Sequence, residues 1–296
     1  MTKILITGGT GLIGKRLQKR LQEKNYEVGI LTRNPKSKKE FLWNINEGYI
    51  DEKAFENTTH IIHLAGAGIA DKRWTIERKK ELINSRVKST NLLIKKIKEY
   101  QVPLKRFVSA SGIGFYGAIT SDKIFKEEDN PENDFISEIC VKWEKSVLQF
   151  QELDIPTTIF RTGIVLSRDG GALQKMNTPL FLSVLGSGNQ FMPWIHIDDL
   201  CNLYIKAIEN NNFTGIFNAV APEHQTNQSF TKTLGRVLNK SVLPMNAPSI
   251  VLKTTLGELA YILLNGSRVS SKKVEESGFK FQFKTLDSSL KNLFSK

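Results

Sequence analysis

The sequence predicts an α/β fold, with a doubly wound parallel sheet of about seven strands and a smaller C-terminal lobe. Short apolar runs alternate with amphipathic segments through the first half of the chain. A glycine-rich turn follows the first apolar run, and Gly and Pro become frequent after Leu166. Regular alternation of strand and helix is typical of βαβ units, whose sheet carries helices on both faces. We therefore expect a Rossmann-type sheet and a separate, loop-rich lobe.

Hydrophobic periodicity places the elements in order along the chain. Leu12, Leu17 and Leu21, for example, recur at the spacing of a helix. The expected strands comprise residues 3–7, 27–32, 60–65, 106–111 and 157–166, and the expected helices residues 12–24, 76–100 and 134–151. Residues 35–58 are hard to assign, but a strand there should complete the first mononucleotide-binding half. Trp194 to Asp199 indicate a short strand that opens a helix capped by an aspartate.

The composition is that of an ordinary globular protein. Cys140 and Cys201 have no metal-ligand spacing, so we expect a reducing compartment, no disulfide and no zinc site. The N-terminus has no signal-peptide pattern, and no apolar run approaches the ~20 residues of a membrane span; we expect a cytoplasmic protein. The net charge of +12 comes from widely spread lysines, which favours a solvated surface over nucleic-acid binding. A basic surface would also suit a phosphate-bearing cofactor.

A glycine-rich loop between the first strand and the first helix predicts a dinucleotide site. Gly8, Gly11 and Gly14 have the spacing G-x-x-G-x-x-G, a variant of the dinucleotide fingerprint. Gly8 allows a tight turn, Gly11 lets the backbone approach a pyrophosphate, and Gly14 lets the helix pack on the strand. The N–H groups at the helix start would bind the phosphates. We assign six loop residues to the cofactor: Gly8, Thr10, Gly11, Leu12, Ile13 and Gly14.

The end of the second expected strand favours NADP over NAD. An NAD site usually carries an acidic residue here, which accepts a hydrogen bond from the ribose 2′-hydroxyl. This chain has Thr32 and Arg33 instead, and a guanidinium can pair with a 2′-phosphate while the threonine adds a hydroxyl contact. Arg33 could also be an ordinary surface arginine on a loop. The missing acid nevertheless makes NADP the better prediction, with NADPH preferred over NADH.

Two lobes are expected on either side of a ligand cleft. The NADP-binding domain should comprise residues 1–165, rejoined by about 190–220, and the smaller substrate lobe residues 166–189 and 221–296. In α/β sheets, ligands bind outside the carboxyl ends of the strands. The cofactor should therefore lie across these ends and the substrate pocket between the lobes.

Several longer motifs resemble those of extended short-chain dehydrogenases and epimerases. They comprise Thr7 to Gly14, His63 to Ala67, Ser109 to Ser111 with Tyr116-Gly117, and Trp194 to Asp199. More closely, the chain resembles the atypical epimerase family proteins of the YfcH type. Features typical of that group are Arg73-Trp74, Asn84 to Arg86, Arg161 to Leu166 and Gly170 to Leu173. The resemblance covers essentially the whole chain.

This resemblance implies further cofactor contacts. Leu64, Ala65 and Gly66, at the end of a strand, would line the adenine–ribose side of the cofactor. Glu81 and Arg86 on the long helix resemble positions that contact NADP, as does Arg161 at the end of its strand. On the residues alone, Glu81 and Arg86 could equally be solvent-facing helix charges.

The acid–base pair of ordinary family members is missing. There, a Tyr and a Lys four residues apart on one helix face exchange a proton with the substrate oxygen, which a Ser orients. If Glu144 takes the place of the acid that commonly follows this motif, Ile136 replaces the Tyr and Cys140 the Lys. Lys142 is two residues out of register and roughly 200° around the helix. The standard mechanism is therefore excluded.

Two other hydroxyls are the candidate catalytic groups. Ser111 ends its strand at the place of the family's serine, although a serine at a strand end is often only a turn or capping residue. Tyr116 lies in the following loop, and its hydroxyl could substitute for the missing one. No metal site is predicted, because His60 and His63 lie on opposite faces of a strand. Cys140 has no adjacent base and is expected to be a core thiol.

Three functions stay open on the sequence. The protein could be an NADP-dependent oxidoreductase or epimerase with a non-standard proton donor, an NADP(H)-binding redox sensor or regulator, or a structural module on a retained scaffold. The intact glycine loop and Arg33 weigh against the third. The missing pair favours unusual chemistry rather than none. The sequence does not identify the small-molecule substrate. No nucleic-acid or membrane partner is expected. The oligomeric state is open, and a homodimer is one possible form.

Overall fold

The computed structural model describes residues 3–295, and its main sheet has eight strands in the order β11-β8-β6-β5-β1-β2-β3-β4. The strands are β1 (Lys3–Thr7), β2 (Glu27–Thr32), β3 (Glu40–Asn44), β4 (Tyr49–Ile50), β5 (Thr58–His63), β6 (Arg106–Gly112), β8 (Thr157–Thr162) and β11 (Gly215–Ala219). Neighbouring strands pair in parallel, except that β4 runs antiparallel to β3 at the sheet edge. The predicted Rossmann-type parallel sheet is confirmed.

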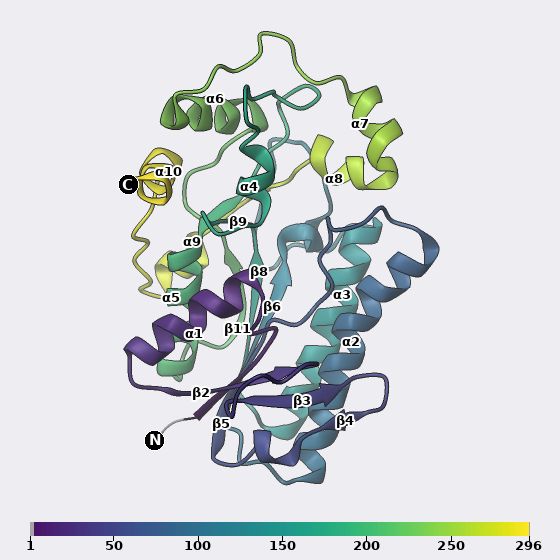
Figure 1. The fold of residues 1–296 in the computed structure, drawn as a ribbon, viewed down its shortest axis with the longest axis vertical. Helices are drawn as coiled ribbons and strands as arrows, with labels where there is room; N and C mark the ends of the chain where they lie inside the picture. Colours follow the sequence, from purple (N-terminus) through teal and green to yellow (C-terminus); the bar gives the residue numbers. More distant parts are fainter. Residues whose placement is uncertain (1–2, 296) are drawn as a thin grey trace.

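Helices cover both faces of this sheet. The helices are α1 (Leu12–Glu23), α2 (Ile76–Glu99), α3 (Phe135–Leu148), α4 (Ala172–Met176), α5 (Ile197–Glu209), α6 (Asn227–Leu238), α7 (Ser249–Leu256), α8 (Tyr261–Leu264), α9 (Lys272–Glu276) and α10 (Leu286–Phe294). Figure 1 shows α1 and α5 on one side of the sheet and α2 and α3 on the other. Along β1, Ile4 and Ile6 join the hydrophobic cluster of α1 and α5, whereas Leu5 joins that of α2. Because side chains alternate between two covered faces, every residue of β1 is buried.

Short 3₁₀ turns complete the regular structure: η1 (Glu52–Ala54), η2 (Ile113–Tyr116), η3 (Gln149–Leu153) and η4 (Gly257–Ala260). Within residues 3–295, no helix combines the length and the apolar character that crossing a membrane requires.

Two expectations are wrong in detail. The expected strand 157–166 divides at Gly163, where β8 ends and β9 (Ile164–Leu166) begins to pair with β10 (Trp194–His196). A Cβ on Gly163 would lie 2.6 Å from the carbonyl oxygen of Pro193, so only glycine fits at this position without a shift of the backbone. The helix after β10 is capped by His196 rather than by an aspartate, because its Nδ1 accepts a hydrogen bond from the N–H of Asp198 at 3.0 Å.

A second lobe lies beyond one end of the sheet, where Figure 1 shows α4, α6, α7 and α8 together. Phe230 and Leu234 of α6 share a hydrophobic cluster with Trp194 and with Leu290 of α10. The chain then returns to the first lobe: β12 (Arg268–Val269) pairs with β7 (Ile124–Phe125), and Phe279 packs in the cluster of α1 and α5. The predicted lobe boundary at residue 221 stays a prediction, and the C-terminal segment contributes to both lobes.

Candidate functional site

A groove of about 710 Å³ crosses the carboxyl ends of β1, β2 and β5. Three segments that each follow a strand form most of its wall: Gly8, Thr10 and Gly11; Leu31 to Asn34; and Leu64 to Gly68. The carboxyl edge of a parallel sheet is the place where α/β proteins bind ligands. The groove therefore contains the glycine loop, Thr32, Arg33 and the segment from Leu64 to Gly66 that the sequence assigned to a cofactor.

The glycine loop leaves space for backbone alone. Gly8 has a φ of +68°, and a Cβ on it would lie 2.9 Å from the carbonyl carbon of Leu64. A Cβ on Gly14 would lie 2.4 Å from the carbonyl oxygen of Gly8, so α1 packs directly on the loop. Gly11 is the exposed N-cap of α1 and supplies no side-chain cap. The first N–H groups of α1 are thus left for a ligand, and they fit the charge of a pyrophosphate.

A buried pair, Thr7 and His63, fixes the strand ends beneath the groove. The Oγ1 of Thr7 lies 2.7 Å from His63 Nδ1 and accepts hydrogen bonds from the two N–H groups that follow β5, both at 3.2 Å. The hydroxyl therefore donates to Nδ1, which leaves the ring proton on Nε2, facing the hydroxyls of Ser89 and Thr90. Complete burial, together with the charge of Arg86, lowers the pKa of His63 to about 3, so the ring is neutral.

Cationic side chains gather at the β2 end of the groove. Arg33 is exposed at the end of β2 and lines the groove together with Lys36, Lys72 and Arg78. Glu81 of α2 lines it too and pairs with Arg78 at 2.7 Å. That hydrogen bond, with the nearby charges of Lys72 and Arg33, lowers the pKa of Glu81. Four cations face two acidic side chains here, an arrangement that fits a phosphate group.

Sequence reasoning missed eleven groove residues, namely Leu31, Asn34, Lys36, Trp43, Ile45, Ala67, Gly68, Asp71, Lys72, Arg78 and Ser85. Trp43 and Ile45 belong to the run 35–58 that resisted assignment, in which Trp43 turns out to be a buried residue of β3. A tryptophan in that run was the available signal. Ala67 ends the motif that begins at His63, whereas residues 68–72 carry neither a motif nor a periodic pattern that could have marked them.

Some residues assigned to the cofactor lie behind the groove. Arg86 is buried and donates to the carbonyl oxygens of Leu82 at 2.8 Å and Ala67 at 3.0 Å. Its guanidinium supports the loop at Gly66 from below, and burial lowers its pKa to about 10. Leu12 and Ile13 pack their side chains against a hydrophobic cluster. These two residues can therefore offer the groove only their backbone N–H groups.

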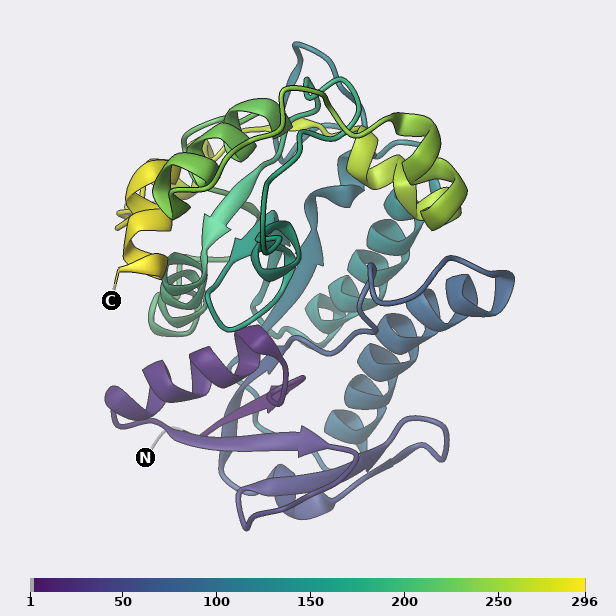
Figure 2. The ribbon, with the colours of Figure 1, turned by 45° about the horizontal axis from the view of Figure 1, so that its top comes forward.

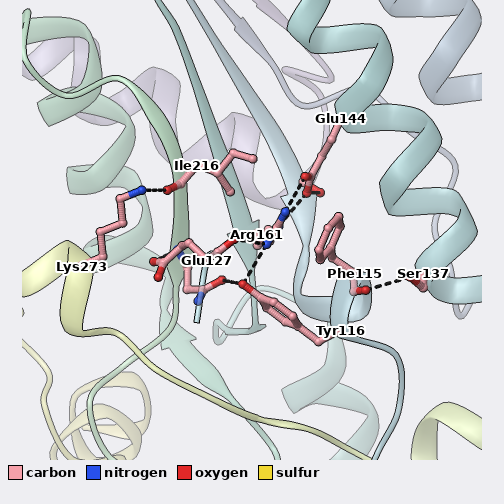
Figure 3. A network of polar contacts seen from close by, with 10 residues as sticks. Phe115, Tyr116, Glu127, Ser137, Glu144, Arg161, Ile216 and Lys273 are labelled. Carbon is pink, nitrogen blue, oxygen red and sulfur yellow. Dashed lines mark hydrogen bonds and ion pairs between the residues drawn. The ribbon is translucent and has the colours of Figure 1, made fainter. Parts of the chain in front are cut away.

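Arg161 lies in a buried polar cluster at the ends of β6 and β8 (Figure 3). Only 2% exposed, it donates from Nε and Nη2 to the two carboxylate oxygens of Glu144, at 2.9 and 2.8 Å. The ring of Phe115 stacks on the guanidinium, with its centroid 3.3 Å from Cζ. Burial alone would lower the pKa of Arg161, but the hydrogen bonds and charge of Glu144 raise it. This arginine does not line the groove.

Both candidate catalytic hydroxyls belong to the same cluster. Ser111 donates to Glu144 at 2.7 Å, and Tyr116 donates to the Oδ1 of Asn218 at 2.7 Å while accepting from Arg161 at 2.9 Å. Tyr116 is fully buried, and this burial raises its pKa to about 12. The structure brings Ser111, Tyr116 and Arg161 together but leaves all three out of the groove wall. Their assigned roles stay predictions.

The helix face that lacks the acid–base pair turns toward the end of β6. A Cβ on Gly114 would lie 2.5 Å from Cγ1 of Ile136 and 3.6 Å from Sγ of Cys140, so both side chains face this turn. Complete burial, with the nearby charge of Glu144, raises the pKa of Cys140 to about 12 and keeps the thiol protonated. Lys142 points outward and pairs with Glu138. Neither Ile136 nor Cys140 can move a proton at these positions.

A second cavity, here called the interlobe cavity, has a volume of about 720 Å³. It lies between the loop that precedes α2 and the second lobe, whose α4, α6 and η4 contribute to its wall. Figure 2 shows α4 between the sheet and the helices α6 and α7. Asp71 lines both the groove and the interlobe cavity, so the two spaces adjoin at this residue. This is where the sequence places the substrate pocket.

Known proteins similar to this chain share both its sequence and its fold. Residues 4–219 match the NAD dependent epimerase/dehydratase family, and residues 247–293 match a domain of unknown function, DUF1731. The chain is 35% identical to the chloroplastic epimerase family protein SDR39U1 homolog of Arabidopsis thaliana, over 97% of this chain and 85% of that protein. It is 34% identical to the epimerase family protein SAB0724c of Staphylococcus aureus, over 100% of both. The crystal structure of human epimerase family protein SDR39U1 (isoform 2) with NADPH superposes with a TM-score of 0.87 and 31% identity, covering 99% of each chain.

Proposed function

The chain belongs to the NAD dependent epimerase/dehydratase family, and on that premise we propose that it binds NADP(H) and uses it to reduce, oxidise or epimerise a small molecule. The observation that carries this proposal is the groove, in which the uncapped start of α1 lies beside a cluster of cations. The related human protein, crystallised with NADPH, supports the choice of cofactor. When bound, the nicotinamide supplies or accepts a hydride.

The wall of the groove favours NADP(H) over NAD(H). The free N–H groups of α1 would hold the pyrophosphate, and Arg33 would pair with the 2′-phosphate beside the hydroxyl of Thr32. An acidic residue at the end of β2 would repel that phosphate, and this chain has none there. Glu81 is already paired with Arg78, which leaves the charge of Arg33 available.

The proton must come from a group other than the missing pair. We propose Ser111, near the end of β6, and Tyr116, in the turn after it, as the candidates, because the α3 residues Ile136 and Cys140 that face this turn cannot act. Each would have to exchange a present partner for the substrate: Ser111 its bond to Glu144, and Tyr116 its bonds to Asn218 and Arg161. The high pKa of Tyr116 keeps its hydroxyl protonated at neutral pH, so it could donate a hydrogen bond or a proton but could not act as a base.

A second candidate function is a non-catalytic NADP(H) sensor or regulator. The observation that favours it is the internal pairing of the cluster, in which Ser111, Tyr116 and Arg161 all bind one another or buried neighbours. A sensor would bind NADPH and NADP with different affinities and would reduce none of a panel of carbonyl compounds. The buried, unpaired Cys140 and Cys201 are compatible with the cytoplasmic location that we also propose.

Replacing Arg33 by alanine tests the cofactor site. We expect the affinity for NADPH, measured by its fluorescence or by calorimetry, to fall about 10- to 100-fold, because one charge-assisted pair with the 2′-phosphate is lost. The affinity for NADH should stay within about twofold, since NADH lacks that phosphate. Lys38→Ala is the matched control, because Lys38 lies on the same loop but does not line the groove.

Two results would count against the proposal. Equal losses of NADPH and NADH affinity in Arg33→Ala would show that Arg33 does not recognise the 2′-phosphate. Wild-type protein that binds none of NADPH, NADP, NADH and NAD would remove the cofactor site altogether and leave a partner-binding scaffold.

A further inference from the structure

We propose that the interlobe cavity binds an apolar small molecule with a single polar end, and not a sugar nucleotide. This inference rests on the proposed function, because the interlobe cavity is the place that function gives to its substrate. Four properties of the cavity carry it: the chemistry of its walls, the state of its polar groups, its size, and the position of its charged residues.

The walls of the interlobe cavity are mostly hydrocarbon. Nine of its eighteen lining residues are Leu, Phe or Met. Phe181 and Leu182 approach from the loop after α4, Phe230 and Leu234 from α6, and Leu263 from α8. A ligand here gains free energy by removing apolar surface from water. Such walls select an apolar body.

Two polar side chains of the walls, Asn227 and Thr178, already have partners in the protein. The side chain of Asn227 accepts from the N–H of Leu185 at 2.8 Å and donates to the sulfur of Met192 at 3.3 Å. The hydroxyl of Thr178 donates to the carbonyl oxygen of Phe181. Sugar hydroxyls need unpaired donors and acceptors, and burying them without such partners costs free energy. A sugar would have to replace the internal hydrogen bonds of these two side chains.

The charged residues lie at one end, where the cavity meets the groove. Asp71 lines both spaces, and Lys175 of α4 donates to the carbonyl oxygen of Ala70 at 3.2 Å. Lys175 is the single cation among the eighteen lining residues, and Asp71 opposes its charge. A diphosphate carries at least two negative charges and is usually held by arginines or a helix start. The site can instead hold one polar end, such as a carbonyl, beside the groove.

The size of the interlobe cavity suits a small molecule. Its volume of about 720 Å³ falls within the roughly 300–1,000 Å³ typical of ligand pockets. Residues of both lobes line it, Ala70 and Asp71 from the first and Leu256 and Leu259, among others, from the second. A small molecule can therefore bury most of its surface there while its polar end reaches the groove.

A solvatochromic dye tests this proposal on the full-length protein. Nile red, an uncharged apolar probe, should bind saturably at one site and shift its emission to the blue. A medium-chain aliphatic ketone should displace it, whereas UDP-glucose should not. The fluorescence of NADPH, recorded in the same samples, reports the groove separately.

Two neighbouring residues give a matched pair of variants. Phe181 lines the interlobe cavity and is 46% exposed, whereas Leu180 is 81% exposed and lies outside it. Phe181→Ser should weaken Nile red binding about fivefold or more, because it removes apolar contact area. Leu180→Ser should leave binding within about twofold. Thr231→Phe should also weaken binding by filling the cavity, and its melting temperature shows whether it folds.

Each outcome has one meaning. Displacement of Nile red by UDP-glucose, or no saturable binding at all, overturns the proposal. Equal losses of Nile red affinity in Phe181→Ser and Leu180→Ser also overturn the proposal, because the dye would then bind the outer surface and not the cavity. If NADPH binds but Nile red does not, this inference falls and the proposed function stands. If Nile red binds but NADPH does not, the proposed function falls and the apolar site stands.

Discussion

The groove and the interlobe cavity have nearly equal volumes, about 710 and 720 Å³, but opposite construction. The groove is built from backbone at the strand ends, with charged side chains at its rim. The cavity is built from Leu, Phe and Met side chains of several short elements. Backbone at the ends of a sheet has little freedom to adjust, whereas apolar side chains repack at modest cost. This fold therefore fixes the geometry of the groove and leaves the cavity adaptable.

The largest loss of stability is expected where a variant removes the buried ion pair near the rigid strand ends. Glu144→Gln leaves the Arg161 guanidinium, 2% exposed, without its anion. We expect the free energy of unfolding to fall by about 3–5 kcal/mol, measured by urea denaturation. Lys142→Ala is the control on the same helix, because its pair with Glu138 is exposed and should contribute no more than about 0.5 kcal/mol. Similar losses in both variants would show that the buried cluster is not a rigid part of the fold.

A smaller effect is expected where α1 packs on the glycine loop. The Cβ of Gly14→Ala would lie 2.4 Å from the carbonyl oxygen of Gly8, which forces a backbone shift. We expect a loss of about 2–3 kcal/mol of stability and weaker NADPH binding. Gly11→Ala is the control, because its Cβ would lie 3.3 Å from that oxygen and the residue is exposed. It should bind NADPH more weakly but unfold within about 1 kcal/mol of wild type. An unaltered Gly14→Ala protein would mean that the loop yields easily.

The smallest effect concerns pH and the neutral His63 beneath the groove. Its pKa of about 3 in the folded protein lies below the ordinary 6.5, so the unfolded chain binds more protons between these values. Stability should therefore fall as the pH drops below 6.5, by roughly 1–1.5 kcal/mol at pH 5.5 from this residue. Urea denaturation of His63→Asn, whose amide can accept from Thr7, should show a shallower decline. An identical pH profile for both proteins would show that His63 is not held neutral.

The sequence predicted the groove far better than the interlobe cavity, for a physical reason. The groove depends on Gly8, Gly11 and Gly14, whose spacing follows from local backbone geometry and is visible in the sequence. The cavity depends on apolar side chains that meet only through tertiary packing, such as Phe181 and Phe230. The sequence alone does not distinguish such cavity-lining residues from ordinary core residues. The frequent Gly and Pro after Leu166 predicted a second lobe, but nothing in the sequence predicted the chemistry inside it.

Arg161 and the 35–58 run show two further limits of sequence reasoning. The strand-end position of Arg161 is visible in the sequence, but its bidentate pairing with Glu144 across the fold is not. In the run 35–58, Trp43 is the one buried residue of β3 and β4 has only two residues, so neither shows a periodic pattern and Trp43 was not placed in the groove wall. Local sequence patterns cannot predict the role of a residue when that role depends on a partner far away in the sequence.

Asp71 adjoins both spaces, so on the proposals above we expect thermodynamic linkage between the two sites. A ligand that orders the loop around Asp71 in one space reduces the entropy that a second ligand must lose in the other. Such coupling is reciprocal: if NADPH raises the affinity for the apolar molecule by some factor, the apolar molecule raises the affinity for NADPH by the same factor. Two ligands of unlike chemistry would then bind cooperatively without touching the same side-chain groups. The loop around Asp71 would then be the part of the chain through which each site responds to the other.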